Sequence, residues 1–279
     1  MSNGKLSPPS SGLGASMSAA AQPVGTHMIV TDEDGLEVGE ARVESLGALV
    51  PVYYARPAAH RAAPVILVVS EVFGVHAHIA DVCRRFAKLG YFAVAADLFA
   101  RHGDASSYET IADLVREVVA KVKDSEVLAD LDASAAWAGE QGGDLARLSV
   151  TGFCWGGRIT WLYCVHNPHV KAGVAWYGRL AGDMSEATPA HPVSLVHDLK
   201  APVLGLYAGQ DPIVPAEARE ATQAQLAAGS EAARASHIVV YPEAGHAFFA
   251  DYRASYREDD ARDGWKRCLA WLADHGAKP

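Results

Sequence analysis

Hydrophobic residues follow two alternating spacings from Pro64 to the C-terminus. Short, contiguous, β-branched apolar runs predict strands, and between them apolar residues recur at helical spacing. The predicted strands are Val65–Ser70, Phe92–Leu98, Leu148–Gly152, Ala172–Tyr177, Val203–Ala208 and Ile238–Pro242. Because strands that alternate with helices pair in parallel beneath those helices, the pattern predicts a mostly parallel α/β sheet covered on both faces.

Four stretches with helical spacing fill the gaps. Gly90 ends the first, a break near Asp124 separates the second from the third, and the fourth closes the chain. The apolar positions that define them are Ile79, Val82, Cys83, Phe86 and Leu89; Ile111, Leu114, Val115, Val118 and Val122; Leu128, Leu131 and Ala135; and Ala261, Trp265, Cys268, Leu269 and Leu272. Cys83 and Cys268 are therefore predicted core residues.

The pattern divides the chain into a leader, residues 1–25, and one domain, residues 26–279. The leader is rich in Ser, Gly, Ala and Pro, which predicts disorder. Residues 27–31 and 36–43 flank an Asp34-Gly35 turn and predict an antiparallel strand pair, with a further extended stretch at 49–54. Arg179–Lys200 is predicted to be irregular, either a flap over a pocket or a surface excursion.

The composition of the chain argues against a nucleic-acid-binding protein and against a membrane protein. The chain has 279 residues, of which 50% are hydrophobic and 20% charged, and its net charge of -9 argues against a nucleic-acid partner. Its longest apolar run, Val65–Val69, is too short to cross a bilayer, and residues 1–25 lack the apolar core of a signal peptide. Four scattered cysteines favour reduced thiols. We expect a soluble cytoplasmic protein without a membrane partner, a monomer or weak homodimer.

The segment Gly152-Phe153-Cys154-Trp155-Gly156-Gly157 follows an apolar strand and precedes a predicted helix. In a sharp strand–turn–helix elbow the central residue is exposed above the helix N-terminus, and its neighbours two residues away must be small. The helix dipole would favour a thiolate at Cys154, and the backbone N–H of Trp155 would point at a developing oxyanion. The pattern predicts a nucleophile, although small residues around a cysteine also arise by packing.

An acid and a base follow Cys154 in the chain order of an elbow hydrolase. Asp211 comes just after the strand that ends at Ala208, and His246 lies in the loop after the last strand, beside Gly245. Each residue alone has an ordinary explanation, a turn with Pro212 for Asp211 and a packed side chain for His246. Three roles in this order at strand carboxyl ends predict a catalytic set.

Glu71 follows the first parallel strand and is predicted to lie at the same edge. A carboxylate after a buried strand needs a partner, which would be either a nearby Arg84 or the Cys154 thiol. The backbone N–H of Val72 would supply a second oxyanion donor. His76 with His78, and His166 with His169, lack accompanying ligands at metal-site spacing, so we expect no metal and no cofactor.

Together these stretches resemble the dienelactone hydrolase family, the carboxymethylenebutenolidases of the α/β-hydrolase fold, from about Val52 to Leu272. The motifs that carry the resemblance are Ser70–Val75, Asp97–Arg101, Gly152–Gly157, Trp176–Gly178, Gly209–Asp211 and Gly245–Phe248. The resemblance implies that Cys154 is the nucleophile, His246 the base and acid, Asp211 the orienting residue, and that Glu71 holds the resting thiol. It implies hydrolysis of an unsaturated lactone to a dicarboxylic acid such as maleylacetate, as in chloroaromatic breakdown.

One departure from the family bears on the substrate. Well-known members bind a substrate carboxylate with an arginine after the fourth-strand motif, which Arg101 matches, and with a second arginine shortly after the catalytic histidine. Ala250 occupies that second position here, and Arg253 is the candidate to replace it. Tyr177 is expected to line the pocket, unless it is simply core.

Two alternatives remain open at this level. The same fold and residues would serve a short-chain carboxylesterase or thioesterase, an alternative that Ala250 keeps open. A redox-sensing or ligand-binding domain with Cys154 as a reactive thiol is the non-enzymatic alternative, although such a thiol does not require Asp211 and His246.

Overall fold

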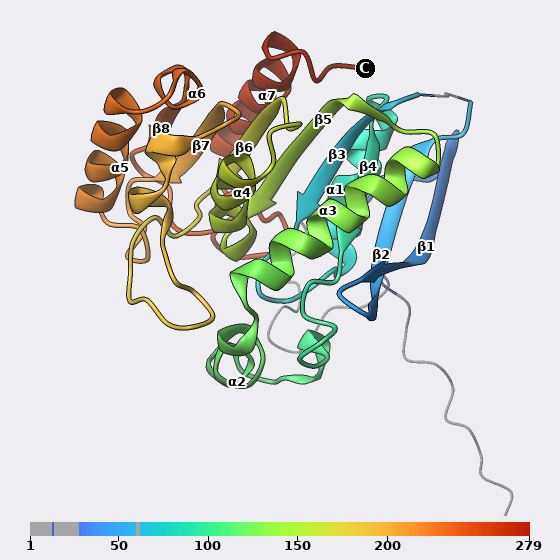
Figure 1. The fold of residues 1–279 in the computed structure, drawn as a ribbon, viewed down its shortest axis with the longest axis horizontal. Helices are drawn as coiled ribbons and strands as arrows, with labels where there is room; N and C mark the ends of the chain where they lie inside the picture. Colours follow the sequence, from blue (N-terminus) through green and yellow to red (C-terminus); the bar gives the residue numbers. More distant parts are fainter. Residues whose placement is uncertain (1–12, 14–27, 60–61) are drawn as a thin grey trace, which may run out of the picture.

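The chain folds around a single twisted sheet. The structure, a computed structural model, describes Leu13 and residues 28–59 and 62–279. The predicted leader lies outside the described residues, Leu13 apart. The strands are β1 Leu36–Ser45, β2 Ala48–Pro57, β3 Pro64–Val69, β4 Phe92–Ala96, β5 Asp144–Phe153, β6 Ala172–Trp176, β7 Val203–Ala208 and β8 His237–Tyr241. They lie in the order β1-β2-β4-β3-β5-β6-β7-β8 (Figure 1).

The helices form layers on the two faces of this sheet. The main helices are α1 Ala77–Lys88, α2 Ile111–Glu117, α3 Asp124–Glu140, α4 Trp155–His166, α5 Ala216–Ala228, α6 Glu231–Ala235 and α7 Glu258–Asp274. Helices α3 and α4 cover one face, and α1 and α7 the other, where the rings of Phe86 and Trp265 lie 4.6 Å apart (Figure 1). Every residue of β3, β4, β6 and β7 is buried, as a sheet covered on both faces requires.

The predicted parallel sheet and all six of its strands are confirmed. Strands β3 to β8 pair in parallel, and β1 and β2 join the sheet antiparallel through β4. Strand β5 begins four residues before the predicted start at Leu148, because Asp144 already pairs with Pro64.

The predicted antiparallel pair at the N-terminus is wrong in its first strand. Residues 28–33 form no strand, and β1 pairs instead with β2 through the turn at Leu46-Gly47. Both turn residues have positive φ, 49° and 73°, which suits a two-residue hairpin loop. Thr31 is held by α1 instead, since its backbone N–H donates to Asp81 and its carbonyl accepts from Arg84. Side chains of α1 therefore pair with the backbone N–H and carbonyl groups of Thr31, which a neighbouring strand would otherwise do.

Two further expectations need correction. The predicted 111–122 helix ends at Glu117, because Val118 leaves helical geometry at φ -121°, and a 3₁₀ turn, η3 Val119–Lys121, follows. The 179–200 segment is not wholly irregular, since it contains the 3₁₀ turns η4 Pro192–Ser194 and η5 Val196–Asp198. Its Ala190 carbonyl accepts from Arg158, which also forms a buried ion pair with Asp124 at 2.6 Å. This segment is thus tied to α3 and α4.

Candidate active site

The strand register brings the predicted site residues to one edge of the sheet. Each of them follows the carboxyl end of its own parallel strand. The backbone pairs nearest that edge are Val69↔Gly152, Phe153↔Trp176, Trp176↔Leu206 and Ala208↔Tyr241. Glu71 and Cys154 both follow the Val69–Gly152 pair at the same offset, and Tyr177 follows on the next strand. Residues from five strands therefore meet where ligands bind in such sheets.

The backbone at Cys154 adopts a sharp elbow. Its φ of 54° and ψ of -113° lie in a region that L-residues rarely adopt, so the surrounding structure must hold it there. A Cβ atom on Gly152 would lie 2.2 Å from the Gly156 carbonyl oxygen, and one on Gly156 would lie 2.3 Å from the Val69 carbonyl oxygen. The two small residues predicted from the sequence are therefore sterically required.

The elbow places Cys154 at the N-terminus of α4. Cys154 is the N-cap residue of this twelve-residue helix, and its carbonyl accepts a hydrogen bond from Gly157 N–H at 3.0 Å. The positive end of the helix dipole favours a negative charge at this position. Cys154 is half-buried, whereas the other three cysteines are buried, and burial raises the pKa of each of their thiols. The one cysteine that solvent reaches therefore lies at the N-terminus of a helix.

The predicted acid and base meet Cys154 in a continuous hydrogen-bonded chain. His246 Nε2 lies 3.1 Å from Cys154 Sγ, and His246 Nδ1 lies 2.7 Å from Asp211 Oδ2. The Asp211 side chain is fully buried, and its other oxygen accepts from Ile213 N–H at 2.8 Å. Asp211 thus fixes the imidazole with Nε2 facing the thiol, the arrangement that a general base needs.

The charge on His246 is set by its two neighbours. Burial by itself would lower the imidazole pKa, but hydrogen bonds and charge from Asp211 and Cys154 outweigh it and raise the pKa to about 10. A raised pKa means that the cation persists through neutral pH, between two groups able to carry negative charge. The His246 cation is therefore held between the Asp211 carboxylate and the Cys154 sulfur.

Glu71 does not have either partner expected from the sequence. Its carboxylate lies 3.0 Å from His76 Nε2 and accepts a longer bond, 3.4 Å, from Tyr252 O–H. Cys154 bonds His246 instead, and Arg84 bonds Tyr53 and Asp81. The expected Glu71–thiol hydrogen bond is absent from the described residues, where the carboxylate contacts His76 and Tyr252 instead.

The two proposed oxyanion donors flank the elbow. The backbone N–H groups of Val72 and Trp155 make no hydrogen bond within the described parts of the chain. Trp155 is the first residue of α4, where an N–H group has no intrahelical acceptor. Val72 is half-buried in the loop that follows β3, beside the elbow. Both donors are therefore available to an oxygen held above Cys154.

The three expected substrate-binding residues lie in different surroundings. Tyr177 is buried with a φ of 41°, its ring packs against His246 with a centroid distance of 5.2 Å, and its hydroxyl has no partner among the described residues. Arg253 is half-buried, and its guanidinium lies 5.5 Å from the centroid of the Phe73 ring. Arg101, in contrast, donates to Asp130 at 2.6 Å. The structure does not bring Arg101 into contact with the triad.

Sequence reasoning missed the polar layer behind the site. His76 and His78, considered only as metal ligands, are buried and hydrogen-bond Glu71 and Asp251. The sequence feature that could have indicated this role is the position of the two histidines, shortly after the buried carboxylate of Glu71. A Cβ atom on Gly245, the residue before His246, would meet nothing within 4 Å, so no close backbone approach requires glycine there. In the described residues, no group of three His, Cys, Asp or Glu side chains could hold a metal ion.

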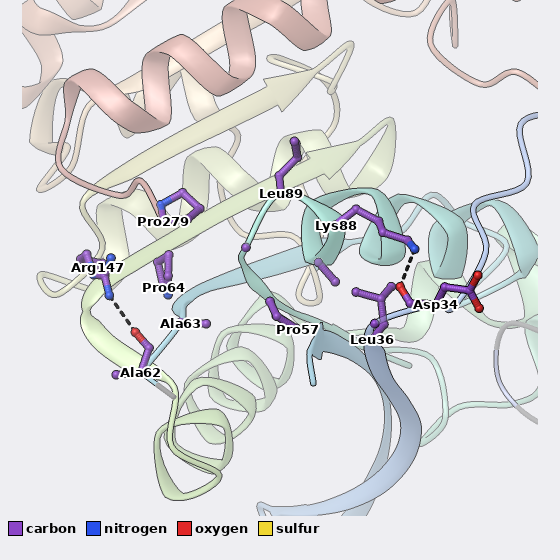
Figure 2. Close-up of a pocket in the computed structure, with 13 residues that line it drawn as sticks. Asp34, Leu36, Pro57, Ala62, Ala63, Pro64, Lys88, Leu89, Arg147 and Pro279 are labelled. Atoms are coloured by element: carbon purple, nitrogen blue, oxygen red, sulfur yellow. Dashed lines mark hydrogen bonds between the residues drawn. The ribbon is translucent and has the colours of Figure 1, made fainter. Parts of the chain in front are cut away.

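A separate cavity of about 490 Å³ lies away from these residues. Figure 2 shows it at the amino ends of β3 and β4, lined by Pro64, Gly90 and Pro279 among others. Two of its charged side chains are already engaged, Arg147 with the Ala62 carbonyl at 2.7 Å and Lys88 with the Asp34 carbonyl at 2.6 Å and with Asp32. No triad residue lines it. The cavity therefore does not belong to the candidate active site.

The fold and the comparisons define the class of protein, an α/β hydrolase. Residues 50–276 match the dienelactone hydrolase family. The chain is 53% identical over 260 residues to a Salmonella typhi protein named "Putative carboxymethylenebutenolidase", covering 93% of this chain and 95% of that one. A Methylorubrum extorquens protein of the same name is 54% identical over 267 residues, covering 95% and 90%.

A solved structure agrees with these sequence matches. The crystal structure of a "Putative Dienelactone Hydrolase" from Klebsiella pneumoniae superposes with a TM-score of 0.82 at 53% identity, covering 85% of this chain and 98% of that one. The chain belongs to the dienelactone hydrolase family, and it is a hydrolase that acts on carboxylic ester or lactone bonds. In residues 28–59 and 62–279, no helix has the length and apolar character needed to cross a membrane.

Proposed function

We propose that the protein is a cysteine-dependent hydrolase of lactones and esters, with Cys154 as nucleophile, His246 as base and acid, and Asp211 as orienting residue. The observation that carries the proposal is the continuous contact from Cys154 Sγ through His246 to Asp211, at 3.1 and 2.7 Å. Cys154 sits on a strained elbow at a helix N-terminus, as an activated nucleophile requires.

Acylation begins from the thiolate–imidazolium pair. The Cys154 thiolate attacks the carbonyl carbon, and the carbonyl electron pair moves to oxygen, which accepts hydrogen bonds from Val72 and Trp155 N–H. The intermediate collapses with cleavage of the carbon–oxygen bond, and the departing oxygen takes the proton from His246 Nε2. For a lactone both parts stay on the enzyme as one acyl chain.

Deacylation reverses these roles. A water molecule gives a proton to the neutral His246 Nε2 and attacks the thioester carbon. The thiolate leaves, the imidazolium is restored beside it, and the carboxylic acid product departs. The Asp211 carboxylate keeps the Nδ1 proton on the imidazole throughout, which fixes the tautomer and stabilises the cation.

An acyl-enzyme trapped on Cys154 tests this proposal. A slow ester is mixed with the enzyme, the reaction is stopped in acid, and the peptide that contains Cys154 is examined by mass spectrometry. The expected result is the acyl mass on Cys154 alone, because the other three cysteines are buried with raised thiol pKa values. The proposal is contradicted if burst kinetics are seen but the acyl group is found on another residue, or if no acyl group is found on Cys154.

For the substrate, we propose a lactone that carries a carboxylate, with Arg253 as its cation. Arg253 makes no side-chain hydrogen bond within the described residues and lies over Phe73, in the loop that follows Glu71. Ala250, where family members carry arginine, is buried and neutral. Tyr177, beside His246, is proposed to line the same pocket. This assignment favours dienelactone, and its product would be a dicarboxylic acid such as maleylacetate.

Arg253→Gln is expected to raise the KM for cis-dienelactone about tenfold, the scale of one charge-assisted hydrogen bond. The KM for neutral p-nitrophenyl acetate should remain within about twofold, since no charge is recognised in that ester. The matched control is Arg101→Gln, which removes the same charge from a side chain already paired with Asp130. Equal changes for both substrates would remove Arg253 from carboxylate recognition.

The alternative within the same chemistry is a short-chain ester or thioester hydrolase, favoured by Ala250. Fast turnover of neutral esters together with no turnover of cis-dienelactone would establish it. Peroxide-sensitive Cys154 without any ester turnover would instead support a redox sensor. The described cysteines are all free, which supports our proposal of a reducing, cytoplasmic location.

A further inference from the structure

A buried polar pair lies next to the proposed nucleophile without belonging to the triad. The Glu71 and His76 side chains are 2% and 3% exposed, and their facing atoms lie 3.0 Å apart. Removing a charged carboxylate from water is costly unless a donor replaces the lost hydration. His76 supplies that donor, since its Nε2 is the closest hydrogen-bonding atom to either Glu71 oxygen.

The position of His76 in the chain makes this contact notable. His76 is the N-cap residue of α1, where a side chain normally accepts a hydrogen bond from the first turn. Its imidazole makes no such bond, and its Nδ1 has no partner within the described residues. The single side-chain hydrogen bond of His76 goes to Glu71. A proton must therefore sit on Nε2 for the pair to form.

Glu71 is surrounded by groups that respond to its charge. Tyr252 O–H lies 3.4 Å from Glu71, and burial together with the Glu71 charge raises the pKa of the Tyr177 and Tyr252 hydroxyls. The ionisable groups that act on the carboxylate are His76, His78, Tyr177 and Tyr252, and the last two also lie within reach of the charge of Arg253. Burial alone would raise the Glu71 pKa, but the His76 bond with the charges of His76 and His78 lowers it to about 2.

A second buried pair fixes the geometry from behind. His78 Nδ1 lies 3.2 Å from Asp251, whose other oxygen accepts from Arg85 at 2.5 Å. Asp251 belongs to the loop that carries His246, and His78 and Arg85 belong to α1. This contact ties the His246 loop to the helix that begins after His76. Helix α1 therefore helps to position both the loop that carries His246 and the Glu71–His76 pair.

We propose that His76 is a positioning residue for the nucleophile: by holding the Glu71 carboxylate, it leaves the Cys154 thiol to pair with His246. Glu71 and Cys154 follow the paired residues Val69 and Gly152 at the same offset on neighbouring strands, so the carboxylate and the thiol start from adjacent positions at this edge of the sheet. The proposal rests on Cys154 being the nucleophile. It makes His76, rather than Arg84 or the thiol, the main partner of the Glu71 carboxylate in this chain.

Two substitutions at His76 separate positioning from packing. In His76→Gln the side-chain amide nitrogen reaches about where Nε2 lies, so a neutral donor to Glu71 is kept. In His76→Phe the ring is kept and the donor is lost. The readout is the pH dependence of iodoacetamide alkylation at Cys154, followed by mass spectrometry of that peptide, which reports on the thiol without any turnover.

The expected result is a profile in His76→Phe that moves to higher pH by about one unit, or about tenfold slower alkylation near neutral pH, because a released Glu71 accepts from the thiol. His76→Gln should keep the wild-type profile. The kcat/KM for p-nitrophenyl acetate should fall about tenfold in His76→Phe and be rescued in His76→Gln. An unchanged His76→Phe profile, or one that moves to lower pH, overturns the proposal.

The effect of His76→Phe is also measured in a protein that carries Glu71→Gln. This comparison tests whether the effect depends on the Glu71 charge, and it remains possible if His76→Phe alone does not fold. With the negative charge removed, adding His76→Phe should cause no further shift, since the pair no longer exists. The double variant also buries no unpaired charge, so it remains measurable if His76→Phe alone does not fold. A further shift in the double variant overturns the proposal. If acyl trapping fails on Cys154 while these profiles behave as expected, the proposed function fails, and His76 orients a thiol that is not the nucleophile; if trapping succeeds and the profiles do not change, only the role of His76 fails.

Discussion

Cys154→Ala is expected to lower kcat/KM for p-nitrophenyl acetate and for lactones by about 10⁴-fold or more. The reason is that the substitution removes the atom that forms the covalent bond, and His246 and Asp211 have no nucleophile to activate without it. The folded structure should be retained, because Cys154 is half-buried at an exposed turn and alanine is smaller. Steady-state rates and circular dichroism on the same preparations measure the two effects.

The matched control is Cys164→Ala in the same helix. Cys164 is buried and its thiol pKa is raised by burial, so its loss should cost about 1 kcal/mol of stability and leave kcat/KM within about twofold. A Cys154→Ala enzyme that keeps wild-type turnover across lactones and esters would remove Cys154 as nucleophile. Equal losses in both variants would point to folding as the cause.

Gly156→Ala is expected to lower the free energy of unfolding by about 3 kcal/mol, the upper part of the range for overpacked sites. The added Cβ would lie 2.3 Å from the Val69 carbonyl oxygen and 2.5 Å from that of Ser70, both of them backbone atoms. Neither can rotate away, so β3 and the elbow must separate. Urea unfolding measures the loss, and the remaining folded enzyme should have reduced activity because the elbow has moved.

Gly245→Ala is the control for this second substitution. A Cβ atom at Gly245 would meet nothing within 4 Å, although the residue adjoins His246. Its stability should stay within about 0.5 kcal/mol of wild type. If both glycine variants unfold at the same urea concentration as wild type, the close approach of the elbow to β3 is not what requires a glycine at position 156.

The strands were predictable because contiguous β-branched runs have few alternatives in a chain of this composition. Phe92–Ala96 and Val203–Ala208 are examples, buried on both faces as such runs predict. The N-terminal hairpin was not predictable in the same way. Asp34-Gly35 and Leu46-Gly47 are both turns, and only packing of β2 against β4 decides which of them joins two strands.

The triad was predictable because chain order and strand ends carry the information. Cys154, Asp211 and His246 each follow a strand of the parallel sheet, and parallel strands end at one edge. The contacts of Arg101 and Glu71 were not predictable. Arg101 pairs with Asp130, which is separated from it in the sequence by helix α2. Glu71 pairs with His76, and this contact depends on the path of the loop between them, which the sequence does not reveal.

The sequence by itself determined the parallel sheet, the elbow and the chain order of Cys154, Asp211 and His246, because hydrophobic period, small residues and chain order are local properties. Only the tertiary structure decided which partner each buried charge takes. Such pairing depends on side-chain directions within a few ångströms, and for Glu71 the result was His76 and not the Cys154 thiol. That choice leaves the thiol facing His246, ready to react.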